Sequence, residues 1–206
     1  MTVFLLFFFG FIFSFVGSIT PSMLNMTALK VSLKKGRNAA NKYALGVSLI
    51  VFPQVIIAVI LTKYISNTPT IFETLEKFGI VIFLFLSYYF YKESRKEKIE
   101  VAASSIKKEN LFLSGITLSV LNMFAIPFFS GTVITLEAFK LFSFDKIPVI
   151  FFTLGSVIGT FYILFLYGKF AKIIQEKTGK LTKDINIVLA ILTGFVAIFT
   201  LVKLFI

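Results

Sequence analysis

A chain of 206 residues that is 57% hydrophobic and contains 28 phenylalanines is much more apolar than a soluble domain, in which about 45 to 50% of residues are apolar. This composition excludes a water-soluble globular protein and predicts an all-α integral membrane protein. The formal net charge of +11 would suggest nucleic acid as a partner of a soluble chain. Here membrane topology accounts for the cations, so no nucleic-acid partner is expected.

The first segment predicted to cross the membrane runs from Phe4 to Ala28. A bilayer core about 30 Å thick needs about 20 apolar residues of helix, and six segments meet that requirement. The other five, in chain order, are Tyr43 to Tyr64, Ile71 to Tyr91, Leu111 to Leu136, Ile147 to Phe170 and Ile185 to Phe205. Little chain is left for loops, so residues 1–206 are expected to form a single membrane domain.

The connections between these segments differ in charge. The first, third and fifth are rich in lysine and arginine, the second has neither, and the fourth has only Lys140 and Lys146. By the positive-inside rule the odd connections are cytoplasmic, which places both termini outside. The chain then divides into repeat one (residues 1–92), a basic cytoplasmic loop (92–110) and repeat two (111–206).

A short polar motif occurs once in each of these halves. Ser22-Met23-Leu24-Asn25-Met26 returns 97 positions later as Ser119-Val120-Leu121-Asn122-Met123. A weaker echo links Leu45-Gly46 to Leu154-Gly155, with an offset of 109. Since each half has three spans, the second half enters the membrane from the opposite side. The sequence therefore predicts six transmembrane helices arranged as two inverted three-helix repeats, the architecture in which transporter sites form between the halves.

The two asparagines are the polar side chains of greatest interest. A buried amide has two donors and an acceptor and is costly to leave unpaired in hydrocarbon. Asn25 and Asn122 could join the two halves by interhelical hydrogen bonds, or they could line a substrate path and hold the ammonium and carboxylate groups of an amino acid. The candidate substrate-binding residues are Ser18, Pro21, Ser22, Asn25, Ser119 and Asn122.

Prolines and glycines mark further positions. Pro21 and Pro127 are candidates for helix breaks that free backbone carbonyls, although either could cause only a simple kink. Gly46, Gly155 and Gly159 predict close helix packing, either within the bundle or at a homodimer interface.

Ionisable and metal-binding side chains are scarce where chemistry would need them. The chain has no cysteine and no histidine, and no acidic or basic residue lies centrally in a predicted span. We therefore expect no metal, no cofactor and no enzymatic activity. No residue stands out for proton coupling, so sodium coupling and uncoupled transport stay open.

These features resemble the lysine exporter family, the LysE/RhtB-type translocators. In that family a small-residue and Pro-Gly-Pro stretch ends the first span, a basic glycine-containing loop follows, and the fourth span has an Asn-Pro-Lys signature. The matching positions here are Gly17 to Ser22, Lys34 to Arg37, and Asn122. The chain departs from the pattern, because Pro21 alone represents Pro-Gly-Pro and only Asn122 is kept of Asn-Pro-Lys. The resemblance implies amino-acid efflux across the bacterial inner membrane, driven by the proton motive force.

The sequence thus predicts a multi-pass secondary transporter in the lipid bilayer. It is expected to export amino acids or similar small zwitterionic solutes by alternating access around the first and fourth spans. The alternative is a substrate-binding membrane subunit of a multi-component transport complex, which would need partner proteins for activity.

Overall fold

The computed structural model describes residues 3–66, 110–122 and 124–177, and in addition positions 84–85, 87–89, 91–92, 95, 187, 190–191, 194–195, 197–198 and 201–202. All regular secondary structure among these residues is helical. The predicted spans Ile71 to Tyr91 and Ile185 to Phe205, and the loop 92–110, lie largely outside the described residues.

The chain forms two compact units, and each unit combines parts of both halves. The first unit comprises Met1–Tyr64 and Val101–Gln175, and the second comprises Ile65–Glu100 and Glu176–Ile206. In the second unit, the Ser87 hydroxyl donates a hydrogen bond to the Ala190 carbonyl (2.8 Å). Every candidate site residue lies in the first unit. A single membrane domain over residues 1–206 stays a prediction.

The first predicted span is two helices rather than one. Helix α1 (Val3–Gly17) ends before a non-helical stretch, and α2 (Met23–Lys35) begins after it. Two local features account for the interruption. Proline disfavours helical geometry in the residue before it, here Thr20, and the Ser22 side chain caps the N-terminus of the new helix by accepting from the Asn25 backbone N–H. The second helix continues well past the expected end at Ala28.

The fourth predicted span is also divided. Helix α5 (Leu111–Val120) is followed by α6 (Ala125–Ala138), and the direction of the helix changes by 63° between them. Pro127 is the third residue of α6. A helix has no internal acceptor for its first four N–H groups, so a proline there removes no hydrogen bond. The interruption precedes Pro127 instead of falling at it.

The two unbroken helices are long enough to cross a membrane. They are α3 (Arg37–Ser66) and α7 (Lys146–Lys169), with mean hydropathies of 2.6 and 2.2 over their most apolar stretches. Within the described residues these are two candidate spans, and α5 with α6 would make a third if the bent pair crosses as one. The all-helical membrane class is confirmed, whereas the full set of six spans stays a prediction.

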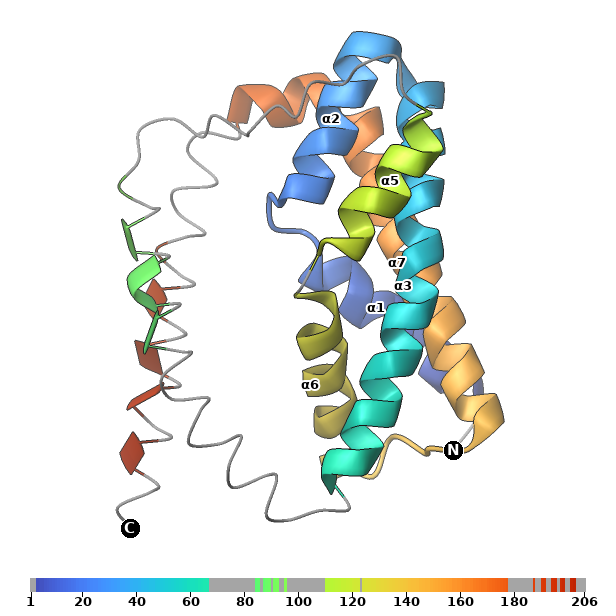
Figure 1. Ribbon diagram of the computed structural model, residues 1–206, viewed down its shortest axis with the longest axis vertical. Helices are drawn as coiled ribbons and strands as arrows, with labels where there is room; N and C mark the ends of the chain where they lie inside the picture. Colours follow the sequence, from blue (N-terminus) through green and yellow to red (C-terminus); the bar gives the residue numbers. More distant parts are fainter. Residues whose placement is uncertain are drawn as a thin grey trace. The chain divides into compact units, whose positions relative to one another are not determined.

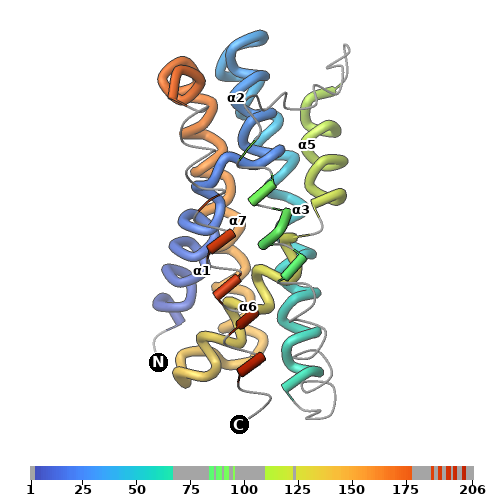
Figure 2. Tube along the Cα trace, turned by 90° about the vertical axis from the view of Figure 1, so that its left-hand side faces the viewer, coloured from blue at the N-terminus to red at the C-terminus, as the bar shows by residue number. Residues whose placement is uncertain are grey.

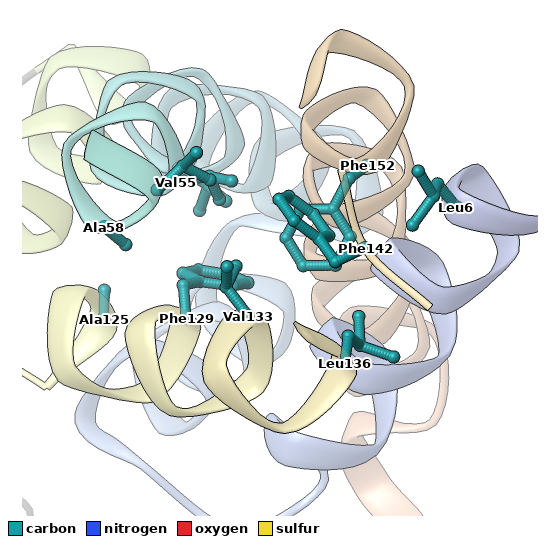
Figure 3. Packing of buried hydrophobic residues seen from close by; sticks show 11 residues of the cluster. Leu6, Val55, Ala58, Ala125, Phe129, Val133, Leu136, Phe142 and Phe152 are labelled. Carbon is teal, nitrogen blue, oxygen red and sulfur yellow. The ribbon is translucent and has the colours of Figure 1, made fainter. Parts of the chain in front are cut away.

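The long helices hold the interrupted ones in place. In Figure 1, α3 runs beside both α5 and α6, and Figure 2 shows α7 running beside α1. A cluster of buried apolar side chains joins α1, α3, α6 and α7 (Figure 3), where Val55 and Ala58 of α3 lie opposite Phe129 and Val133 of α6. Its members are Leu6, Val51, Val55, Ala58, Val59, Ala125, Phe129, Val133, Leu136, Phe142 and Phe152.

Glycines bring α1 and α7 into backbone contact. A Cβ atom at Gly10 would clash with the carbonyl oxygen of Phe152, and one at Gly155 would clash with that of Phe7. Gly159 faces the Phe11 carbonyl in the same way. The absence of a side chain at these positions is what lets the two helix backbones touch, as expected of small residues in membrane helices.

The same arrangement joins α3 to α5. A Cβ atom at Gly46 would clash with the Phe112 carbonyl oxygen, and one at Gly115 would clash with that of Tyr43. Each contact has a counterpart in the α1 and α7 pair. Gly46 and Gly155 thus lie at close contacts between helices of the same molecule, and the two contacts use equivalent pairs of glycine and carbonyl.

The two crossings show how the halves correspond. Gly10 and Gly115 are 105 positions apart, while Gly46 and Gly155 are 109 apart. Two serine hydrogen bonds have the same two offsets. The Ser14 hydroxyl donates to the carbonyl of Ser156 (2.8 Å), and the Ser119 hydroxyl donates to that of Val47 (3.1 Å).

The offset in the first and fourth spans therefore differs from the 97 positions that separate the two Ser-x-x-Asn motifs. In the folded chain Ser119 is equivalent to Ser14 and not to Ser22. Contacts between backbones fix the alignment of two helices to a single turn, whereas a short polar motif can recur two turns away. The offset of 109 between Gly46 and Gly155 agrees with the weaker echo in the sequence.

The glycine contacts predict a large difference between two alanine substitutions. We expect Gly46→Ala to lower the free energy of unfolding by about 1 to 3 kcal/mol, since the new methyl group must push α5 away. Gly131→Ala in α6 is the control, because a Cβ atom there has nothing within 4 Å. Unfolding in mixed micelles by added denaturing detergent measures both, and equal stabilities would contradict the packing described here.

Candidate functional site

Side chains donate hydrogen bonds to three consecutive backbone carbonyls within the interruption of the first span. The Asn25 side-chain amide donates to the carbonyls of Ser18 (2.6 Å) and Thr20 (2.9 Å). The Tyr167 hydroxyl donates to the carbonyl between them, that of Ile19 (2.6 Å). Because an unpaired carbonyl in hydrocarbon costs several kcal/mol, these three bonds are what allow the chain to leave the helix at this depth.

Asn25 is the centre of this arrangement. Its side chain is 2% exposed, and both of its N–H groups are used within its own half of the chain. Tyr167 comes from α7 in the other half, and its hydroxyl lies beside the Asn25 side chain. The link between the halves at this point is therefore a tyrosine to backbone bond, and the asparagine shapes the interruption.

The neighbouring candidate residues have distinct places. Pro21 lies half-buried within the interruption, and Ser22 is exposed as the N-cap of α2. Ser18 is half-buried, and its backbone N–H closes the last turn of α1 on the Ser14 carbonyl (3.1 Å). The N-terminus of α2, with its partial positive charge, thus opens beside the interruption.

The fourth span has its polar residues at the end of α5. Ser119 is buried, and its carbonyl accepts from the Asn122 backbone N–H (3.0 Å) and from the side-chain amide of Gln54 (2.9 Å). The Asn122 side chain is half-buried and has no hydrogen bond within the described part of the chain. The C-terminus of α5, with its partial negative charge, ends at these groups.

The two interruptions lie next to each other. Gly17, the last residue of α1, lies against the end of the Phe128 ring in the first turn of α6, and a Cβ atom at Gly17 would clash with that ring. The structure thus brings the two broken spans together. Among the described residues, no hydrogen bond joins Asn25 to Ser119 or to Asn122.

Sequence reasoning missed two residues of this site. Tyr167 was not singled out, because one tyrosine near the end of an apolar span is common at a membrane interface. Gln54 was also missed, although an amide beside Pro53 in the middle of a predicted span is an available signal. Both act on backbone carbonyls of other segments, which only the folded chain reveals.

The groups around the two interruptions can hydrogen-bond to a small polar solute. In the described residues there is no group of three or more histidine, cysteine, aspartate or glutamate side chains. What the site offers is hydroxyls, amides, and helix ends of opposite polarity, which recognise a solute through hydrogen bonds and dipoles.

Apolar spans that are interrupted close to each other are a feature of many helical membrane transporters. The sequence profile of the LysE type translocators matches residues 15–204, and the chain belongs to this family. It is therefore a membrane transporter and not an enzyme, and the family implies export of an amino acid or another small solute. A search of curated proteins and a search of solved structures each found no match.

Proposed function

We propose that this protein is a secondary transporter that exports amino acids or similar small zwitterionic solutes across the bacterial inner membrane by alternating access. The observation that carries the proposal is the contact between the two interrupted spans at Gly17 and Phe128. Family membership supports translocation, and the interruptions supply the place in the membrane where a polar solute can be held.

The opposed helix ends suit a zwitterion. The carboxylate of an amino acid is stabilised near the N-terminus of α2, and its ammonium group is stabilised near the C-terminus of α5. Ser22 and Asn122 are the candidate side chains at these two ends. Asn25 acts on the site indirectly, because its donors are already bonded to the backbone of the interruption.

Movement between outward and inward states requires parts that stay rigid and parts that bend. The glycine crossings of α1 with α7 and of α3 with α5 are tightly packed, and we assign them to the rigid parts. The gaps between α1 and α2, and between α5 and α6, are where the backbone bonding is already broken. Bending there opens the site to one side of the membrane and then to the other.

Counterflow in proteoliposomes that contain only this protein tests the proposal. A panel of labelled amino acids is presented with and without proton and sodium gradients, beside liposomes that lack protein. We expect saturable exchange of one class of amino acid, and the gradient that changes it identifies the coupling ion. Folded protein that exchanges nothing would reject the self-sufficient carrier and favour a subunit of a larger transport complex.

The proposed orientation can be tested with single cysteines, since the chain has none of its own. Asn38→Cys lies in the first connection and Lys146→Cys in the fourth, and both positions are exposed. A membrane-impermeant maleimide added to intact spheroplasts should label Lys146→Cys, and it should label Asn38→Cys only after permeabilisation. The opposite pattern would place the termini in the cytoplasm.

A further inference from the structure

Gln54 holds an acceptor that nothing in the described structure uses. Its side chain is 6% exposed, its Nε2 donates to the Ser119 carbonyl (2.9 Å), and its Oε1 is buried without a hydrogen-bond partner. The assignment of the two amide atoms follows from chemistry. A carbonyl can only accept, so the nitrogen must face Ser119 and the oxygen is the unpaired atom.

A buried acceptor without a partner is rare in folded proteins, and each case calls for an explanation. Among the described residues only one other buried side-chain atom lacks a partner, the hydroxyl of Ser48. A serine hydroxyl in a helix can rotate toward the carbonyl four residues back, so Ser48 needs no ligand. The amide oxygen of Gln54 cannot donate, so turning it toward a backbone carbonyl would not give it a hydrogen bond.

The internal repeat shows that packing does not require this glutamine. With the offset of 109 that relates Gly46 to Gly155, the position equivalent to Gln54 is Ile163 on α7, which is also buried. The crossing of α1 with α7 therefore forms with an aliphatic residue in this place. The glutamine belongs only to the crossing that ends at the interruption of the fourth span.

The position of Gln54 indicates the charge of its ligand. Its amide lies at the C-terminus of α5, where the helix dipole favours a positive group, and its free atom is an acceptor. We propose that Gln54 Oε1 receives a cationic group during transport, supplied by the ammonium group of the substrate or by a monovalent metal ion. The inference rests on the proposed function for its first source and deepens it by naming the acceptor.

The buried state of Oε1 means that the ligand enters when α5 and α6 rearrange. Nε2 keeps the glutamine attached to the Ser119 carbonyl, three residues before Asn122, so that the acceptor stays with the end of α5. Gln54 then fixes one end of a zwitterion that the N-terminus of α2 holds at the other.

Two variants of Gln54 and one control variant distinguish a role of Oε1 in binding a ligand from a role of the side chain in packing. Gln54→Leu removes the amide and approaches the isoleucine of the equivalent crossing, while Gln54→Glu keeps an acceptor oxygen. Thr62→Val is the matched control, because Thr62 is buried on the same helix and donates to the Ser130 carbonyl (3.5 Å) outside the site. Each variant is compared with the wild type at equal amounts of folded protein.

The first readout is competition in the counterflow assay between an exchanged amino acid and the carboxylic acid analogue in which hydrogen replaces the ammonium group, so that no donor is left for Oε1. For ammonium recognition, Gln54→Leu should raise the half-saturation concentration of the amino acid about tenfold or more and leave that of the carboxylic acid analogue unchanged. Thr62→Val should stay near the wild-type value. Gln54→Glu should fall between the wild type and Gln54→Leu, because its carboxylate still offers an acceptor but no longer donates to the Ser119 carbonyl.

The second readout is the melting temperature of the purified proteins in sodium, potassium or choline chloride, which needs no transport. Stabilisation by one metal ion that Gln54→Leu alone loses would assign the acceptor to that ion, even if the wild type exchanges no amino acid. If Gln54→Leu matches Thr62→Val in both readouts, the inference is overturned while the proposed function stands on its own assay.

Discussion

A backbone carbonyl inside a bilayer must have a hydrogen-bond donor, and the interrupted spans of this protein depend on that constraint. The first span leaves the helix at Ser18, Ile19 and Thr20, and the donors come from Asn25 and Tyr167. Without them the chain would gain by continuing as a regular helix, and the N-terminus of α2 would not open inside the membrane. The polar site therefore exists because two side chains make the interruption stable.

The glycine crossings supply the frame around this site. They repeat between the halves with fixed offsets, so the same backbone contact occurs twice. The side chains beside the two contacts differ. One crossing ends near Asn25 and Tyr167, whereas the other ends at Gln54 and Asn122. We propose that these differing residues carry the function, because the two helix ends beside them offer opposite polarity to a solute.

Much of this could be predicted from the sequence, because composition and hydropathy are sums over many residues. The helical membrane class and the family were confirmed, and Gly46 and Gly155 do lie at close helix contacts. The correspondence of the first and fourth spans was wrong by eight positions, since a five-residue motif says nothing about depth in the membrane. Tyr167 and Gln54 could not be found in the same way, because both bond to backbone groups far away in the chain.

The central claim, that Asn25 builds the site by holding the interrupted backbone, is tested most directly by amino-acid exchange of Asn25→Ala. Thr27→Ala is the control, because the Thr27 hydroxyl donates to the Met23 carbonyl of its own helix and lies beside the Tyr43 hydroxyl, and neither contact involves the interrupted backbone. At equal amounts of folded protein, we predict that Asn25→Ala loses at least about tenfold in exchange rate, as expected when two half-buried carbonyls lose their donors, and that Thr27→Ala keeps the wild-type rate. Wild-type exchange by Asn25→Ala would contradict the account.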